Sequence, residues 1–112
     1  MKKTFRFKSD AYKKARGGYS RCLLLRCEKC KQTILLYQKD GPGILKRLYV
    51  DRVIAPAGLP GRKNQNLTCK GCKTVLGIPF LYKKENRPAW RLFAGAVEKE
   101  VVGVGEVAGI RF

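Results

Sequence analysis

The sequence predicts a mainly β fold, a small single domain built from β-hairpins or two small sheets, with a basic N-terminal arm. Three observations support this prediction: the length of 112 residues, short β-branched and aromatic runs separated by Gly and Pro, and two widely spaced CxxC pairs. A length of about 100 to 150 residues is the commonest for one domain. We therefore expect an arm over residues 1–21 and one β domain over residues 22–112.

The arm and the first strands surround the first cysteine pair. Residues 5–7 alternate Phe with a charged residue, which favours a short strand, whereas residues 10–18 are typical of a mobile basic arm. Residues 20–26, with their three consecutive leucines, predict a strand that leads into the first pair. Residues 33–37 predict a strand that leads out of it.

The middle of the chain contains one clear turn and one ambiguous segment. Residues 40–43 have the sequence Asp-Gly-Pro-Gly, which is typical of a turn. Residues 44–55 contain apolar side chains that fit either a helical face or a strand, and we favour a strand. Residues 56–66 contain two Pro, two Gly and a basic pair, which predicts an exposed loop.

Two or three further strands follow the second cysteine pair. Residues 74–82 predict a strand that is bent by Gly77 or Pro79, and residues 88–97 predict a partly buried strand containing Trp90. The valine-rich residues 101–112 can form an edge strand, although three glycines weaken it.

The cysteine spacing points to a metal site. Cys27 and Cys30 form one CxxC pair, and Cys69 and Cys72 form a second pair 38 residues later. Two such turns supply the tetrahedral four-thiolate shell that Zn²⁺ favours, so the two pairs are expected to act as zinc knuckles that clamp the β-hairpins together. Flanking lysines would offset the thiolate charge, and Gly71 would allow a positive φ in the second knuckle. An iron–sulfur cluster is the main alternative metal group.

One structural zinc leaves little chemistry for catalysis. Four protein ligands leave no open position on the ion, so we expect it to stabilise the fold without activating water. The chain has no His, and the remaining Cys22 lies beside three leucines, which favours a buried apolar role over a nucleophile. The sequence therefore predicts a protein that is not an enzyme.

Charge is the second strong feature of the composition. Basic residues outnumber acidic ones by 25 to 8, giving a formal net charge of +17, and the excess lies in residues 1–91. Such a charge favours a polyanionic partner. No segment reaches the roughly 20 apolar residues of a membrane-spanning helix, and the charged start lacks the apolar core of a secretory signal. We therefore expect a cytoplasmic protein with no membrane contact.

The cysteine pattern resembles that of a known group of zinc folds. The two CxxC pairs, the long β-rich interval and the Cys-x-x-Cys-x-x-x-Leu-Gly run from Cys69 to Gly77 are similar to the Yippee-like or β-tent group. This resemblance implies that each CxxC pair caps one sheet and that a single zinc joins the sheets. The same group includes B-type methionine sulfoxide reductases, but no cysteine follows Cys72 to serve that activity. A simpler zinc ribbon, as in ribosomal and transcription proteins, fits the cysteines equally well.

Together these observations predict a non-catalytic zinc protein that binds nucleic acid, with RNA or the ribosome favoured over DNA. No helix able to read a major groove is evident, which disfavours sequence-specific DNA binding. The alternative is a zinc-ribbon transcription-associated protein or a protein-interaction adaptor. Aromatic side chains could stack on unpaired bases. The side chains expected to contact phosphates are basic residues of the arm and of one loop, namely Lys2, Lys3, Arg6, Lys8, Lys13, Lys14, Arg16, Arg21, Arg62 and Lys63.

Overall fold

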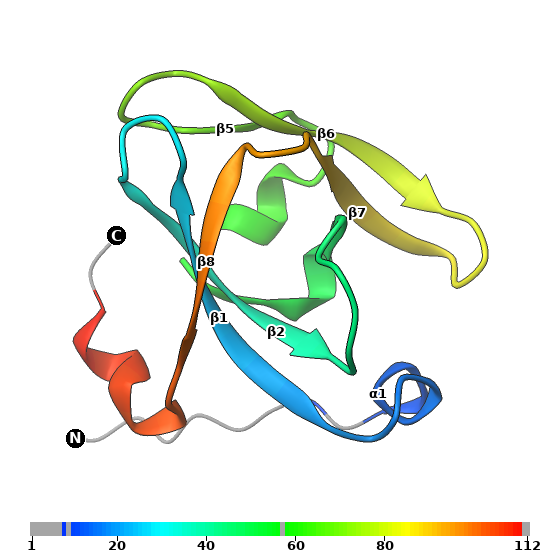
Figure 1. Ribbon diagram of the computed structural model, residues 1–112. Helices are drawn as coiled ribbons and strands as arrows, with labels where there is room; N and C mark the ends of the chain where they lie inside the picture. The colour runs from blue at the N-terminus through cyan, green and yellow to red at the C-terminus, as the bar shows by residue number, and fades with distance from the viewer. Residues whose placement is uncertain (1–7, 9, 57, 111–112) are drawn as a thin grey trace.

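The computed structural model describes residues 8, 10–56 and 58–110 and contains two four-stranded antiparallel sheets (Figure 1). Sheet A has the strand order β4-β2-β1-β8, with β1 at Ser20–Cys27, β2 at Thr33–Asp40, β4 at Val53–Ala55 and β8 at Val97–Val102. Sheet B has the order β3-β7-β6-β5, with β3 at Arg47–Tyr49, β5 at Leu67–Thr68, β6 at Val75–Tyr82 and β7 at Arg87–Leu92. The predicted mainly β, single-domain fold is confirmed.

Strand β1 is buried on both of its faces, which explains its three consecutive leucines. Leu23 and Leu25 point into the main core, whereas Leu24 belongs to a second apolar cluster with Cys22 and Val102. Apolar residues of the 3₁₀ helix η3, which spans Val104–Gly109, and of its C-terminal end pack against this second cluster. The sequence of a strand that is covered on both faces is a continuous apolar run, because the side chains on both faces are shielded from water.

The main core lies between the two sheets and is centred on Trp90. Trp90 is fully buried, and its indole N–H donates to the Gln65 carbonyl at 2.8 Å. Side chains from both sheets complete this core, including Leu25, Leu35, Tyr37, Leu48, Leu67 and Leu76. The core therefore joins the two sheets, and each β-hairpin contributes to it.

The predicted arm over residues 10–18 differs from the structure, because its central part is the short helix α1 at Ala11–Ala15. Asp10 caps this helix by accepting hydrogen bonds from the N–H groups of Tyr12 and Lys13, both at 3.1 Å. A helix of five residues is too short for a detectable apolar periodicity. The predicted strand at residues 5–7 lies outside the described residues.

Two other segments also refine the prediction. Residues 44–55 do contain strands, β3 and β4, but the 3₁₀ turn η1 at Val50–Arg52 separates them. The predicted loop at residues 56–66 contains the 3₁₀ turn η2 at Leu59–Arg62.

The predicted strand at residues 88–97 ends at Leu92, and a turn that contains Gly95 at φ 73° leads to β8. The predicted edge strand at residues 101–112 instead lies at 97–102 and is followed by η3. No helix in the described part of the chain is long and apolar enough to cross a membrane.

Candidate metal centre

The two CxxC pairs form knuckles with the same backbone geometry. In the first knuckle, Cys27 N–H donates to the Gln32 carbonyl and Lys31 N–H donates to the Cys27 carbonyl, both at 2.8 Å. The second knuckle repeats both bonds at 2.8 Å, from Cys69 to Thr74 and from Lys73 to Cys69. The first knuckle connects β1 to β2, and the second connects β5 to β6. Each sheet therefore supplies one pair of sulfur atoms from the end of a hairpin.

The positive φ angles of the knuckles lie at lysines, not at the predicted Gly71. Lys31 and Lys73, each directly after the second cysteine of its pair, have φ angles of 66° and 64°. A Cβ atom at Gly71 would instead meet the flexible end of the Gln32 side chain from the other knuckle. Gly71 therefore lies directly against the other knuckle.

The four sulfur atoms lie close enough to share one ion. The Sγ atoms of Cys27, Cys30, Cys69 and Cys72 all lie within 4.8 Å of one another. The Sγ atoms of Cys27 and Cys72 are 3.7 Å apart, and those of Cys30 and Cys69 are 3.4 Å apart. A tetrahedron with Zn–S bonds of about 2.3 Å has edges of about 3.8 Å. The donor set and its spacing therefore fit a single structural zinc held by these four cysteines.

In each CxxC pair the first cysteine is buried and the second is exposed. Cys27 and Cys69 are fully buried, whereas Cys30 and Cys72 are exposed. The Thr74 hydroxyl, 3.1 Å from the Cys72 sulfur, and the Thr74 backbone lower the pKa of Cys72 to about 6. The Gln32 backbone lowers the pKa of Cys30, but its contact with the Cys69 thiol and its desolvation outweigh this and raise the pKa to about 11. Zinc binding at neutral pH must therefore release thiol protons.

The fifth cysteine takes no part in this centre. Cys22 is 1% exposed and packs with Leu24, Leu36 and Val102 in the second apolar cluster. Burial raises the pKa of its thiol. The prediction of a buried apolar role for Cys22 is confirmed.

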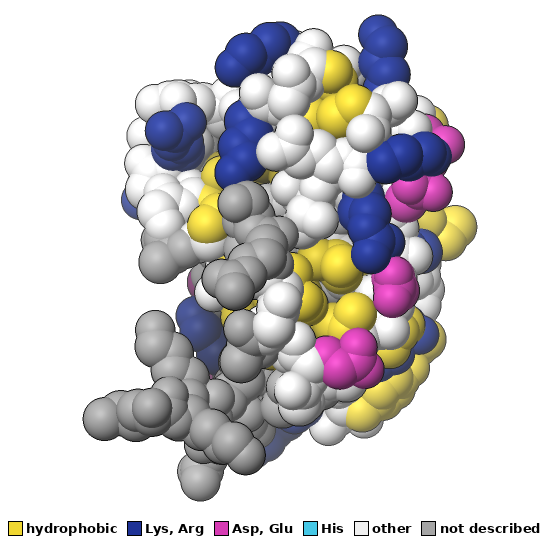
Figure 2. Space-filling view, turned by 90° about the vertical axis from the view of Figure 1, so that its left-hand side faces the viewer, with side chains coloured by type: hydrophobic (Ala, Val, Ile, Leu, Met, Phe, Trp, Pro, Cys, Tyr) yellow, Lys and Arg dark blue, Asp and Glu magenta, His cyan; other side chains and the backbone are white. Residues whose placement is uncertain are grey.

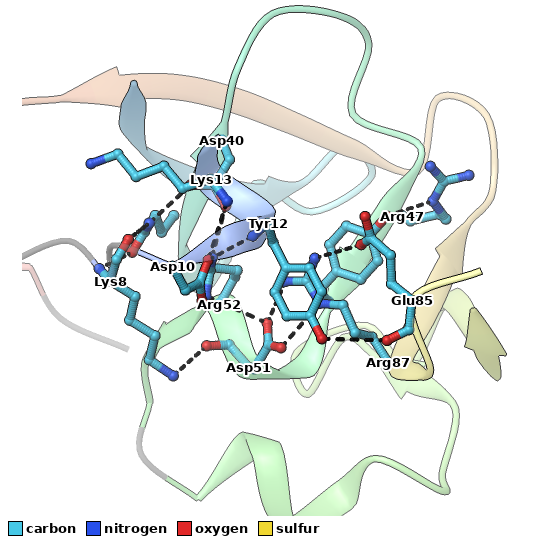
Figure 3. Close-up of polar contacts among 12 residues, drawn as sticks. Lys8, Asp10, Tyr12, Lys13, Asp40, Arg47, Asp51, Arg52, Glu85 and Arg87 are labelled. Atoms are coloured by element: carbon cyan, nitrogen blue, oxygen red, sulfur yellow. Dashed lines mark hydrogen bonds and ion pairs between the residues drawn. The ribbon is translucent and has the colours of Figure 1, made fainter. Parts of the chain in front are cut away.

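At the opposite end of the hairpins, a buried cluster of arginines and carboxylates joins the sheets (Figure 3). The Arg52 side chain is only 1% exposed, and its Nε donates to Asp40 at 2.8 Å while its NH2 group donates to Asp10 at 2.6 Å. Its third nitrogen, NH1, lies 3.9 Å from Asp51. Arg52 therefore connects α1, the end of β2 and η1.

Arg87, at the start of β7, is the second centre of this cluster. Its guanidinium donates two hydrogen bonds to Asp51, at 2.6 and 3.1 Å, and a third to Glu85 at 2.9 Å. It also lies 4.0 Å from the ring centroid of Tyr12 and 3.8 Å from that of Tyr49. The bidentate pairing and the flanking aromatic rings suit Arg better than Lys.

Two carboxylates of this arginine cluster, Asp10 and Asp40, have lowered pKa values. Hydrogen bonds from Arg52 lower the pKa of Asp10 despite partial desolvation. Burial raises the pKa of Asp40, but hydrogen bonds from Ser20, Gln38 and Arg52 outweigh it and lower the pKa below the ordinary 3.8. Both carboxylates are therefore ionised throughout the physiological range.

No protein-family model, no curated protein and no solved structure matches this chain. The resemblance to the Yippee-like or β-tent group therefore stays a prediction. The cysteine cluster itself is compatible with a zinc-binding domain.

The predicted phosphate contacts fall into several groups. Arg16 belongs to the arginine cluster, because its NH2 group lies 2.8 Å from Glu85. Lys8 donates to the Asp51 carbonyl at 2.6 Å, and Arg21 lies in β1 and not in the arm. The other described members, Lys13 and Lys14 of α1 and Arg62 and Lys63 at η2, lie on separate elements, and Lys2, Lys3 and Arg6 are outside the described residues.

Sequence reasoning missed the arginine cluster and the buried Lys39. Arg52 and Arg87 have no motif around them, and their partners come from distant parts of the chain. Lys39 is 8% exposed in β2. Only its alternation with Tyr37, which shares its face of the strand, could have indicated that it points towards sheet B.

Proposed function

We propose that this chain is a non-catalytic, zinc-stabilised domain that binds RNA through its basic surface. The single observation that carries the proposal is that most acidic side chains are already ion-paired within the protein. Seven of the eight carboxylates form ion pairs within the described residues, and several of them share the same cation, the partners being Arg16, Arg26, Lys31, Arg52 and Arg87. The other carboxylate, Glu106, accepts a hydrogen bond from the Gly103 N–H at 3.2 Å.

This pairing leaves most of the positive charge without a matching acid. Residues 53–84, which include the second knuckle and η2, contain six basic residues and no Asp or Glu. Figure 2 shows basic side chains spread over the upper half of one face, at the height of the knuckles, and acidic ones in a row down one side. Because each phosphate contact releases a counterion, such a surface favours a polyanion.

RNA is favoured over DNA on structural grounds. The one α-helix among the described residues is five residues long and packs by Tyr12 and Arg16 against the arginine cluster. It therefore cannot enter a major groove as a recognition helix. Exposed aromatic side chains, including Tyr19 and Phe93, are available for stacking on unpaired bases.

The test is to purify tagged protein from cells and to measure its zinc content and bound RNA, with and without nuclease, over a salt series. We expect one zinc per chain. If six or more phosphates are contacted, affinity should fall by roughly a thousandfold between 50 and 200 mM salt. Protein partners that survive nuclease and the absence of salt-sensitive RNA would instead support the adaptor alternative.

A further inference from the structure

A small pocket opens between the two sheets, beside the segment that connects β2 to β3. Its volume is about 160 Å³. Five basic side chains line it, namely Arg16, Lys39, Lys46, Arg47 and Arg52. Since one water occupies about 30 Å³ of liquid, this inter-sheet pocket has room for a few waters or one small anion.

Lys39 is a buried cation in this pocket without a carboxylate partner among the described residues. Its ammonium group donates to the carbonyl oxygens of Gly41 and Pro42 at 3.0 and 3.2 Å. An ammonium group has three N–H donors, so one remains available. Burial and the nearby charges of Arg21 and Lys99 lower the pKa of Lys39. Burying an unpaired charge is costly, and an anion would remove that cost.

Two tyrosines of the lining carry hydroxyl groups. The Tyr37 oxygen accepts from the Tyr49 N–H at 2.8 Å, and the Tyr49 oxygen accepts from Arg16 and Arg47 at 3.1 and 3.2 Å. Within the described residues neither hydroxyl hydrogen has an acceptor, and both tyrosines line the pocket. The Tyr49 hydroxyl, which contacts Arg16 and Arg47 of the lining, can therefore donate to a ligand.

The one acidic residue in the pocket lining does not supply the missing acceptor. Asp40 already accepts hydrogen bonds from Ser20, Gln38 and Arg52, at 2.6, 2.9 and 2.8 Å. Donors therefore outnumber free acceptors in the pocket. An oxyanion with several acceptor oxygens, such as a phosphate group, fits this imbalance.

An apolar groove adjoins the pocket and shares the residues 44–47 with it. Its volume is about 620 Å³, and its lining includes Ile44, Leu92 and Phe93 together with the basic side chains of Lys46, Arg47 and Arg91. Ile44 and Phe93 are 75% and 48% exposed. An apolar floor beside a phosphate-sized pocket matches the alternation of base and phosphate along a single strand.

We propose that the inter-sheet pocket binds one phosphate group of a single-stranded RNA, with the adjoining base lying over Ile44 and Phe93. This proposal rests on the proposed RNA-binding function. The recognised chemistry is a phosphate, which could come from the strand or from free phosphate in solution.

The test measures the binding of three probes to zinc-loaded protein by thermal shift and by calorimetry. The probes are inorganic phosphate, a 5′-phosphorylated RNA tetranucleotide and a single nucleoside, which carries no phosphate. We expect both phosphorylated probes to stabilise the protein and the 5′-phosphorylated RNA to bind more tightly than inorganic phosphate. Binding of inorganic phosphate alone would overturn the link to RNA.

The variants are Lys39→Met, Lys46→Gln and, as a matched control, Lys84→Gln in the exposed turn after β6. Lys39→Met and Lys46→Gln should lower phosphate affinity about tenfold or more, because each removes a charge-assisted hydrogen bond. Lys84→Gln, which also removes one positive charge, should lower it less than about twofold. Lys39→Met should leave the free protein at least as stable, because it removes an unpaired buried charge.

An equal loss in all three variants, or no binding of phosphate to the unmodified protein, would overturn the pocket. The proposed RNA-binding function is tested separately, by the RNA retained on protein purified from cells, because that retention does not require this pocket. RNA retained with no phosphate binding would overturn only the further inference.

Discussion

The two ends of the molecule join sheet A to sheet B by different chemistry. Strands β2 and β6 both begin beside a knuckle and run away from it, so that β2 ends at Asp40 and β6 ends just before Glu85. At the zinc end, two short turns bring four sulfur atoms to one point. At the other end, Asp40, Arg52, Asp51 and Arg87 form a continuous chain of ion pairs between the sheets.

The difference shows which kinds of contact a sequence reveals. Metal ligands come from a repeated local motif, because each knuckle is a turn of fixed spacing. The arginine cluster combines residues from the cap of α1, the end of β2, η1, the turn after β6 and the start of β7, and each is an ordinary charged residue in the sequence. The zinc end requires deprotonated thiols, whereas the arginine cluster requires ionised carboxylates, so the two ends can be perturbed separately.

The largest expected effect is the loss of the metal centre. Cys69→Ser should abolish zinc binding and unfold the domain, because a structural zinc contributes on the order of 10 kcal/mol. The measurements are zinc stoichiometry and far-UV circular dichroism. Cys22→Ala is the control and should retain one zinc per chain. A Cys69→Ser protein that keeps the native spectrum without zinc would show that the arginine cluster and the core are sufficient.

The next effect concerns the arginine cluster. Arg87→Met should reduce the free energy of unfolding by about 3 to 5 kcal/mol in urea, because Asp51 and Glu85 lose a buried partner. The zinc content should stay at one. Arg91→Met is the control on the same strand, where the arginine is exposed and stacks 5.0 Å from the Phe80 ring centroid. Equal losses of unfolding free energy in both variants would show that the arginine cluster does not stabilise the fold more than an exposed arginine does.

A pH series tests the charge state of the same cluster. The pKa of Asp40 is lower in the folded protein than its ordinary 3.8, so its ionised form stabilises the fold above that pH. The stability difference between unmodified protein and Asp40→Asn should be constant above about pH 5 and shrink as the pH falls below 3.8. Comparing the two proteins at each pH isolates Asp40 from the titration of the thiols. A difference that is independent of pH would exclude this role for the Asp40 charge.

The smallest expected effect comes from an ion pair outside both ends. Arg26 and Glu100 pair at 2.9 Å between β1 and β8, with side chains 33% and 52% exposed. Arg26→Gln should change the free energy of unfolding by less than about 1 kcal/mol, and salt should reduce the change further. A loss of unfolding free energy as large as that of Arg87→Met would mean that the exposed and the buried ion pairs contribute equally to stability.

Much of the fold could be predicted because its signals are local. The strands around the first cysteine pair, the strand at 74–82, buried Trp90 and the four-cysteine centre all follow from spacing and apolar pattern. Helix α1 could not be predicted, because Tyr12 and Arg16 hold it in place through contacts with β7 and with Glu85. The burial of Lys39 depends on how sheet B lies over the end of β2, which no local pattern encodes.

The pairing of β1 with β8 joins the first and the last strand of the part of the chain that the structure describes. Cys22 lies opposite Val102, so β8 forms one edge of sheet A. The two knuckles are complete once Cys72 has been made, and zinc can then bring the hairpins together early. We expect the pairing of β8 with β1 to be the slower step, because contacts between residues distant in the sequence tend to form after local ones. Val97, which belongs to both β8 and the apolar groove, is therefore positioned last, so we expect the groove to be one of the final features to form during folding.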